Sequence, residues 1–378
     1  MDSTSADPAA DGAVRAEDLH CLADAERAAA TVLPAAVRDF VAGGSGAEVT
    51  LDANRTALDG VFVVPRVLRD VSKCTTATTL LGRPARLPLA LAPVAYQRLV
   101  HPEGEPAAAR AARAAGVPFT ASTLSSVPVE ALTALGGDVW FQLYWLRDAE
   151  RSLDLVRRAE DAGATAVMLT VDVPWMGRRL RDVRNRFALP DHVRAAHLEE
   201  GPSAAHRAPS GPGHGSALAA HTAAVFSPAL TWSSVEALRE RTRLPLVLKG
   251  VLAAEDAVRA AECGVDAVVV SNHGGRQLDG ALPSVDALPE VVAQVAGRCE
   301  VLLDSGVRSG TDVLRALALG ASGVLVGRPA LWGLAVGGEG GVRRVLDLLA
   351  DEFRDALGLA GCPDPAAARE LRTVRHGG

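Results

Sequence analysis

The chain has 378 residues, of which 48% are hydrophobic and 22% charged, and its formal net charge is −6. A chain of this length and composition can bury a large core and is too long for a small accessory module. The acidic balance, with no block of Lys and Arg, excludes the electrostatic surface that non-specific nucleic-acid binding needs, so no nucleic-acid partner is expected.

The cysteines point to a reducing compartment. The five are scattered, with no CxxC pair and no His spacing suited to zinc, which is typical of free thiols and argues against a structural metal. No stretch approaches the ~18 uninterrupted apolar residues of a membrane span, and the N-terminus is acidic where a signal peptide would start with positive charge. We therefore expect a cytoplasmic protein with no membrane partner.

The N-terminal part of the chain predicts a tail followed by a helical segment. Residues 1–14 are small and polar, which predicts a disordered tail, and 15–378 are expected to form one domain. Apolar residues at helical spacing predict helix over 22–41, ending at the glycine cluster of 43–46. No strand precedes this cluster, which therefore favours a turn over a phosphate-binding loop.

From residue 87 onward one unit repeats, a short apolar run that ends in a polar residue or glycine and is followed by an Ala-rich helix. Eight such runs occur, at 87–93, 117–122, 139–144, 166–172, 244–250, 266–273, 300–306 and 322–329. The helices between them are expected at 105–115, 129–135, 152–162, 254–263, 284–295 and 311–319. This α/β pattern favours a closed (β/α)8 TIM barrel over an open doubly wound sheet.

One long interruption follows the fourth strand. It covers 190–230, is rich in Gly, Pro, His and Ala, and far exceeds the usual length of a connection. It is either a lid over the barrel mouth or a disordered surface loop.

Polar residues end the apolar runs, at the carboxyl ends of the strands where such barrels carry their active sites. In strand order they are Gln142, Tyr144, Thr170, Asp172, Lys249, His273, Arg276, Asp304, Arg308, Gly327 and Arg328. Cationic side chains at the ends of apolar strands would be costly to desolvate without partners or ligands. They indicate a site for an anionic substrate and a phosphorylated cofactor.

The most specific stretch is SNHGGRQLD, at 271–279. With it, the chain from about 18 to 359 resembles the FMN-dependent 2-hydroxy-acid oxidases and dehydrogenases, a family that includes glycolate oxidase, lactate oxidase and mandelate dehydrogenase. The resemblance implies an FMN-dependent enzyme that oxidises an (S)-2-hydroxy acid to the 2-oxo acid. It is strongest toward the branch that acts on mandelate or 4-hydroxymandelate.

The resemblance implies a role for each of five side chains. His273 would be the catalytic base and Arg276 would grip the substrate carboxylate, which suits an imidazole that titrates near neutral pH and a forked guanidinium. Asp172 would orient the histidine, although taken alone it could be a helix cap. Arg179 would be a second substrate arginine, and the hydroxyl of Tyr144 would bond the substrate. The alternatives are a core histidine, a solvated arginine and a core aromatic.

The cofactor contacts are also expected from the resemblance. Lys249 would lie beside flavin N1 and O2, where a cation stabilises the negative charge of the reduced flavin, the alternative being a surface lysine. Arg308 and the pair Gly327-Arg328 would bind the phosphate between strands seven and eight. Further contacts are expected from Pro93, Val94, Ala95, Ser122, Gln142, Thr170, Ser271, Asp304 on the ribityl chain, Ser305 and Gly306.

Three positions depart from the family pattern. Phe40 stands where many members carry tyrosine, and Leu124 stands where glycolate oxidases carry tryptophan. Ser305 replaces a glycine of the common DGGVR string. Phe40 and Leu124, together with Tyr96, predict a large apolar pocket and hence mandelate or 4-hydroxymandelate as substrate, with a long aliphatic 2-hydroxy acid as the alternative. Ser305 affects only the local geometry near the phosphate.

The electron acceptor and the assembly rest on the resemblance as well. Ala95, next to the expected flavin N5 face, resembles the oxidases where some dehydrogenases carry glycine, which favours O2 as acceptor and H2O2 as product over another acceptor. The family suggests a homotetramer. A different FMN-barrel chemistry and a catalytically silent binding barrel are the rival functions, and neither requires the His273, Arg276 and Lys249 present here.

Overall fold

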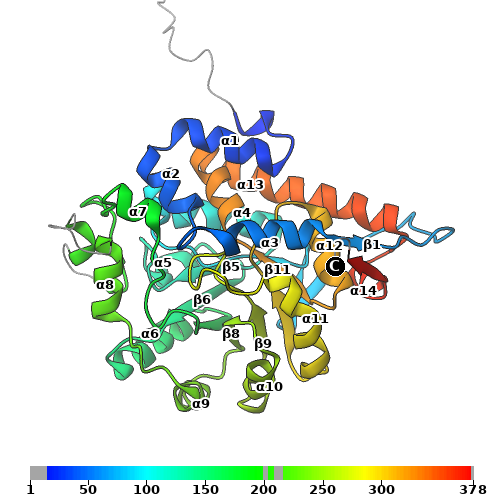
Figure 1. Ribbon diagram of the computed structural model, residues 1–378. Helices are drawn as coiled ribbons and strands as arrows, with labels where there is room; N and C mark the ends of the chain where they lie inside the picture. The colour runs from blue at the N-terminus through cyan, green and yellow to red at the C-terminus, as the bar shows by residue number, and fades with distance from the viewer. Residues whose placement is uncertain (1–14, 199–202, 208–215, 376–378) are drawn as a thin grey trace, which may run out of the picture.

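A computed structural model describes residues 15–198, 203–207 and 216–375, so the predicted tail at 1–14 lies outside the described residues. Eight parallel strands form a closed barrel in the order β10-β11-β4-β5-β6-β7-β8-β9 (Figure 1). The strands are β4 (Leu89–Leu91), β5 (Phe119–Ser122), β6 (Val139–Tyr144), β7 (Ala166–Thr170), β8 (Leu246–Val251), β9 (Ala267–Val270), β10 (Glu300–Leu303) and β11 (Gly323–Val326). Each lies within a predicted run or within one residue of it. The closed order confirms the TIM barrel and excludes the open sheet.

The strands alternate between two cores because successive side chains point to opposite faces. On β6, Trp140 packs with the small cluster inside the barrel, whereas Phe141 and Leu143 pack with the large cluster beneath the helices. A hairpin of β2 (Thr78–Leu80) and β3 (Arg83–Ala85) adds Leu80 and Ala85 to the inner cluster. The barrel is therefore a filled core rather than a pore.

The outer helices largely match the predicted ones. They are α4 (Glu105–Ala115), α5 (Val129–Thr133), α6 (Ala149–Asp161), α9 (Trp232–Arg241), α10 (Ala254–Glu262), α11 (Ser284–Val295), α12 (Gly310–Ala318) and α13 (Arg328–Ala360). Helix α6 begins three residues earlier than predicted because the Asp148 side chain caps it, accepting from the backbone N of Arg151 at 3.2 Å. Helices α9 and α13 were not among the predicted helices.

The N-terminal helix predicted over 22–41 is wrong as a single element. The chain forms α1 (Leu22–Val32) and α2 (Ala35–Ala42), which are followed by α3 (Val49–Asp59). Proline disfavours helical dihedrals in the residue before it, and Leu33, which precedes Pro34, has φ −83° and ψ 138°. Helices α1 and α2 lie against α13 over one side of the barrel (Figure 1).

The insert after β7 contains helical structure. Its neighbourhood holds α7 (Leu180–Arg184), η3 (Ala204–His206) and α8 (Ala217–Val225), while 199–202 and 208–215 lie outside the described residues. Backbone bonds tie its far end to the end of β6, with Arg147 N donating to Val225 O and Ser227 N to Trp145 O, both at 2.9 Å.

Smaller elements complete the fold. They are η1 (Ala16–Asp18), η2 (Gln97–Leu99), α14 (Pro365–Ala368), and β1 (Val61–Val63), which pairs with β12 (Thr373–Arg375). None of the helices in the described ranges has both the length and the apolar character needed to cross a membrane.

Candidate active site

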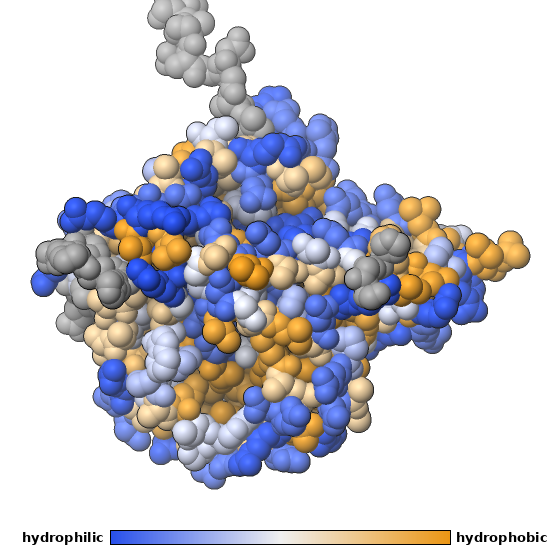
Figure 2. All heavy atoms as spheres, in the orientation of Figure 1, coloured by the Kyte–Doolittle hydropathy of each residue, from blue (hydrophilic) through white to orange (hydrophobic). Residues whose placement is uncertain are grey.

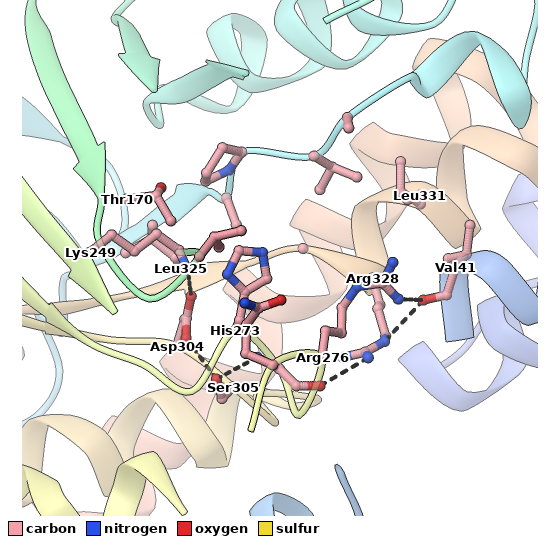
Figure 3. A pocket seen from close by; sticks show the side chains of 18 of the residues that line it. Val41, Thr170, Lys249, His273, Arg276, Asp304, Ser305, Leu325, Arg328 and Leu331 are labelled. Atoms are coloured by element: carbon pink, nitrogen blue, oxygen red, sulfur yellow. Dashed lines mark hydrogen bonds and ion pairs between the residues drawn. The ribbon is translucent and has the colours of Figure 1, made fainter. Parts of the chain in front are cut away.

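One cavity opens at the carboxyl ends of the strands and gathers most of the predicted site residues (Figure 3). Those that line it are Phe40, Pro93, Val94, Ala95, Leu124, Tyr144, Thr170, Arg179, Lys249, His273, Arg276, Asp304, Ser305, Gly306, Arg308, Gly327 and Arg328. The other five predicted residues, Tyr96, Ser122, Gln142, Asp172 and Ser271, are not part of its lining. Segments far apart in the chain thus converge on one site at the barrel mouth.

An imidazole and a carboxylate form the chemical centre of the cavity. His273 Nδ1 lies 3.0 Å from Asp172 Oδ1. Because the ionised carboxylate only accepts, Nδ1 carries the proton and Nε2 is left as the basic nitrogen. Burial lowers the pKa of His273 below its ordinary value, although the charge of Asp172 opposes this shift. The histidine is therefore neutral at physiological pH and able to take a proton.

Asp172 is held by the strand-end loops around it. Burial alone would raise its pKa, but the charge and hydrogen bond of His273 and the charge of Lys249 keep the pKa of Asp172 below its usual range. A Cβ at Gly250, which has φ +106°, would lie 2.5 Å from the carboxylate carbon, so only glycine leaves room for this side chain. Gln277 Nε2 donates to Asp172 O at 2.8 Å. Sequence reasoning gave no role to Gln277, although it lies inside the SNHGGRQLD string.

Two arginines lie beside the ring of Phe40, of which Arg179 is buried and Arg276 half-buried. The guanidinium carbons of Arg179 and Arg276 lie 5.9 and 5.4 Å from the ring centroid. The ring of Phe187 also stacks on the ring of Phe40, with centroids 4.6 Å apart, and holds it in place. Burial and the neighbouring charge of Arg276 lower the pKa of Arg179 to about 9. A carboxylate bound here would relieve the repulsion between the two cations.

The same loop carbonyls orient Arg276 and a third arginine. Arg276 Nη1 donates to Phe40 O and Gly43 O, both at 2.8 Å. Arg328 Nε donates to Val41 O at 3.1 Å, and its Nη2 to Gly43 O at 3.2 Å and Gly274 O at 2.9 Å. Figure 3 shows the two guanidiniums turned toward Val41. The glycine cluster after α2 therefore acts through its carbonyls, as a turn rather than as a phosphate loop.

A second set of donors in the cavity, Arg308 and Arg328, fits the phosphate of FMN. Arg328 begins α13, whose helical conformation is interrupted at Gly337 and Gly338, and Arg308 stacks over Trp332 at 4.9 Å. Neither guanidinium has a carboxylate within 4.0 Å among the described residues, and burial lowers the pKa of Arg308 to about 10. Half-buried cations without a counterion, beside a helix N-terminus, form a site for a dianion.

The wall between the phosphate end and the imidazole is polar and suits the isoalloxazine edge. Lys249 Nζ lies 2.9 Å from Asp304 Oδ2 and donates to Ser271 Oγ at 3.0 Å (Figure 3). Burial would lower the pKa of Lys249, but the charges of Asp304 and Asp172 raise it above its ordinary value, so the amine stays charged. Asp304, predicted on the ribityl chain, is thus also the counterion of this lysine.

A second polar chain reinforces this wall from behind. Ser122 Oγ donates to Gln142 Oε1 at 3.0 Å, and Gln142 Nε2 donates to Thr170 Oγ1 at 3.1 Å. Thr170 is the member that lines the cavity. Ser305 has φ +74°, the conformation that explains why glycine is usual there, and its Oγ accepts from Gly274 N at 2.9 Å.

The apolar wall was only partly predicted. Besides Leu124, it includes Leu218 and Phe226 from the insert, and Phe226 stacks on Tyr144 with centroids 4.5 Å apart. Burial raises the pKa of Tyr144 to about 12, so its hydroxyl remains protonated. The described part of the insert therefore contributes side chains to the wall of the cavity. The signal that could have found it is the uninterrupted helix-forming stretch at 217–225.

The ring of Tyr96 is placed differently from the expectation that it lines the pocket. Its side chain is 1% exposed and packs in the large core cluster, and its backbone N donates to Leu124 O at 3.0 Å. Tyr96 has φ +57°, which directs its chain segment around Leu124. Its contact with the cavity is therefore made through Leu124.

Comparisons with known proteins agree with this geometry. The profile of the FMN-dependent dehydrogenase family matches residues 29–374. The chain is 64% identical to 4-hydroxymandelate oxidase of Amycolatopsis orientalis, covering 93% of this chain and 97% of the relative. It is 48% identical to L-lactate oxidase of Nostoc sp., covering 89% and 93%. A crystal structure of mandelate oxidase with (S)-4-hydroxymandelic acid is similar with a TM-score of 0.92 and 63% identity, covering 94% of this chain and 99% of that one.

Proposed function

This chain belongs to the FMN-dependent dehydrogenase family, and from that premise we propose that it oxidises an (S)-2-hydroxy acid with an aryl group to the 2-oxo acid. It is a flavoprotein oxidoreductase with FMN as cofactor. (S)-Mandelate and (S)-4-hydroxymandelate are the proposed substrates. The observation that carries the proposal is one cavity in which Arg179, Arg276 and His273 face an apolar wall.

The side chains divide the substrate between them. Arg179 and Arg276 would bind the carboxylate, since both are cationic, line the cavity and lie beside the ring of Phe40. His273 Nε2 would take the proton that leaves the substrate, because Nδ1 already donates to Asp172. The resulting imidazolium lies against the Asp172 carboxylate, which stabilises its charge. Tyr144, protonated near neutral pH, would donate to the substrate oxygen.

Bound FMN supplies the two-electron acceptor that oxidation of an alcohol to a ketone requires. Lys249, the polar chain that ends at Thr170, and the two phosphate arginines would hold it. The charged Lys249 amine would stabilise the negative charge of the reduced flavin. The aryl group would pack on Leu124, Leu218 and Phe226, and burying a ring of this size contributes about 1.5–3 kcal/mol relative to leaving the ring exposed to water.

We propose O2 as the electron acceptor, so that one 2-hydroxy acid and one O2 give one 2-oxo acid and one H2O2. The relatives named oxidases and the presence of Ala95 in the cavity wall support this assignment. Equal amounts of H2O2 and 2-oxo acid in air are expected. Turnover only with an artificial acceptor would identify a dehydrogenase.

We also propose a homotetramer located in the cytoplasm. Val67, Leu68 and Leu359 are 80%, 102% and 82% exposed, an apolar surface that assembly would cover. Hydrophobic residues gather on the projection that carries β1 and the loop after it, at the right of Figure 2. The five unpaired thiols support a reducing compartment. Light scattering of the purified holoenzyme should give four chain masses, and a monomer mass would contradict the assembly.

The substrate assignment is tested with the purified yellow protein. We expect kcat/KM for (S)-mandelate to exceed the values for lactate and glycolate by about tenfold or more, because only the aryl substrate fills the apolar wall. A highest value for 2-hydroxyoctanoate would identify the long aliphatic alternative. A highest value for glycolate would overturn the aryl pocket.

A further inference from the structure

The apolar wall of the cavity contains one hydroxyl that the reaction does not use. Thr222 lies on α8 and is 4% exposed, and it lines the cavity together with Leu218 and Phe226. Positions spaced by four residues share one helix face, so α8 and the residue after it present Leu218, Thr222 and Phe226 as one stripe. Thr222 is the polar member of this stripe.

The hydroxyl of Thr222 has an unfilled acceptor. Its single proton has two protein acceptors in reach, Ala219 O at 3.0 Å and Met176 Sδ at 3.7 Å. Whichever of them receives the proton, the lone pairs of Oγ1 remain. Among residues 15–198, 203–207 and 216–375, no protein donor bonds to this oxygen. A buried hydroxyl with its proton committed recognises donors rather than acceptors.

The other residues that line the cavity indicate which part of the substrate would meet Thr222. The carboxylate of the proposed substrate is held by Arg179 and Arg276, and its reacting carbon is near His273, so the ring extends along the apolar wall. A substituent in the para position is the part of the ring farthest from the reacting carbon. The neighbours of Thr222 on this wall, Met176 and Leu218, are apolar, and they offer a ring hydroxyl no acceptor of comparable strength.

We propose that Thr222 Oγ1 accepts a hydrogen bond from a hydroxyl on the substrate ring, so that phenolic 2-hydroxy acids are the preferred substrates. This inference rests on the proposed aryl-substrate function and assigns the residue that distinguishes its two proposed substrates. Unsubstituted mandelate still fits the wall but leaves the oxygen without a donor. Methyl or fluoro substituents in the same position cannot supply a donor and gain nothing from Thr222.

The test compares Thr222→Val with Thr222→Ser, because valine keeps the shape without the oxygen and serine keeps the oxygen. In the unaltered enzyme, kcat/KM for (S)-4-hydroxymandelate should exceed that for (S)-mandelate. Thr222→Val should lower this ratio by about threefold to tenfold, the effect of one hydrogen bond between neutral groups. Thr222→Ser should keep the ratio, and the ratio of 4-fluoromandelate to mandelate should be the same in all three proteins.

The outcomes separate the inference from the function on which it rests. An unchanged ratio in Thr222→Val, with mandelate still oxidised, overturns the role of Thr222 alone. Failure of the unaltered enzyme to oxidise either aryl acid overturns the proposed function. If Thr222→Val is inactive toward both, its flavin absorbance change reports the dissociation constants of 4-hydroxyphenylacetate and phenylacetate, which lack the reacting hydroxyl. Selective weakening of the phenolic ligand supports the inference, and equal weakening of both contradicts it.

Discussion

The 3.0 Å contact between His273 Nδ1 and Asp172 Oδ1 determines which imidazole nitrogen serves as the base. It fixes the tautomer, leaves Nε2 to take the proton, and places a negative charge where the imidazolium forms. Burial acts in the opposite direction, since it lowers the pKa of His273 and keeps the resting histidine neutral. The pair therefore combines a resting state that can accept a proton with a partner that stabilises the protonated state.

Asp172→Asn should lower kcat by about 10²-fold to 10⁴-fold, the range associated with loss of a positioned acid or base. The amide is isosteric but uncharged, and its NH2 group can donate to Nδ1 and shift the ring proton to Nε2. FMN content should not change, because Asp172 does not line the cavity. Anaerobic bleaching of the flavin measures the effect. The double variant with His273→Ala should be no slower than His273→Ala alone, and additive losses would show that the two residues act separately.

The pH dependence of kcat/KM should report the same pair. Because the pKa of His273 is lowered from its ordinary value of 6.5, the neutral base persists below that pH, and activity should fall only at more acid values. The charge of Asp172 raises the pKa of His273, so its removal in Asp172→Asn should move the acid limb to still lower pH. Initial rates at low substrate concentration across the acid range provide the measurement. An acid limb above 6.5 would contradict the neutral resting state.

Much of the site was predictable because strand ends in a parallel barrel converge. Lys249 lies near the end of β8, and His273 and Asp304 follow β9 and β10, the next two strands of the barrel. Their proximity therefore follows from the topology, and the structure places all three in the cavity lining. The SNHGGRQLD string, through the family resemblance that it carries, indicated which reaction these residues serve. The prediction of one helix over 22–41 was wrong at Pro34. It relied on the helical spacing of the apolar residues and gave too little weight to the proline, which ends α1.

Other features depend on packing that a single sequence does not encode locally. Helix α8 lies in an insert of unusual length. Its position over the cavity depends on contacts between residues distant in the chain, such as Phe226 and Tyr144. The side chain of Tyr96 faces the core because of a left-handed backbone conformation, which neighbouring residues do not specify. The ion pair of Lys249 with Asp304 likewise follows from the register of β8 and β10 around the barrel.

Arg276→Lys should raise KM for the substrate by about tenfold or more, with a smaller effect on kcat. Arg276 Nη1 is committed to Phe40 O and Gly43 O, so its remaining donors are the ones that reach the carboxylate. A lysine amine cannot bond two carbonyls and grip a planar carboxylate at the same time. Arg181→Lys is the matched control, since Arg181 pairs with Glu48 outside the cavity lining and should leave KM unchanged. Equal KM values for Arg276→Lys and the unaltered enzyme would remove Arg276 from the carboxylate site.

A second buried histidine, His197, couples the insert to the loop that carries Leu124. It is 5% exposed, Nδ1 donates to Thr123 O at 3.1 Å, and Nε2 accepts from the backbone N of Val129 at 2.9 Å. Burial lowers the pKa of His197 below 6.5, a shift that its bond to Thr123 only partly opposes. Protonation would place a proton on Nε2, which would then face the N–H of Val129, donor against donor. Acid should therefore weaken the contact between the insert and this loop.

The free energy of unfolding should therefore fall as the pH drops below about 6.5, because the unfolded chain takes up the proton first. The contribution of His197 is fully present above that pH and is lost through its folded-state pKa, with a slope of at most about 1.4 kcal/mol per pH unit. His273 adds to the same trend, so the informative quantity is the difference between the unaltered protein and His197→Gln. Glutamine keeps an acceptor and does not titrate, and should be less stable near neutral pH but lose less stability in acid. Parallel curves of melting temperature against pH for the two proteins would show that His197 carries no pH-dependent stability.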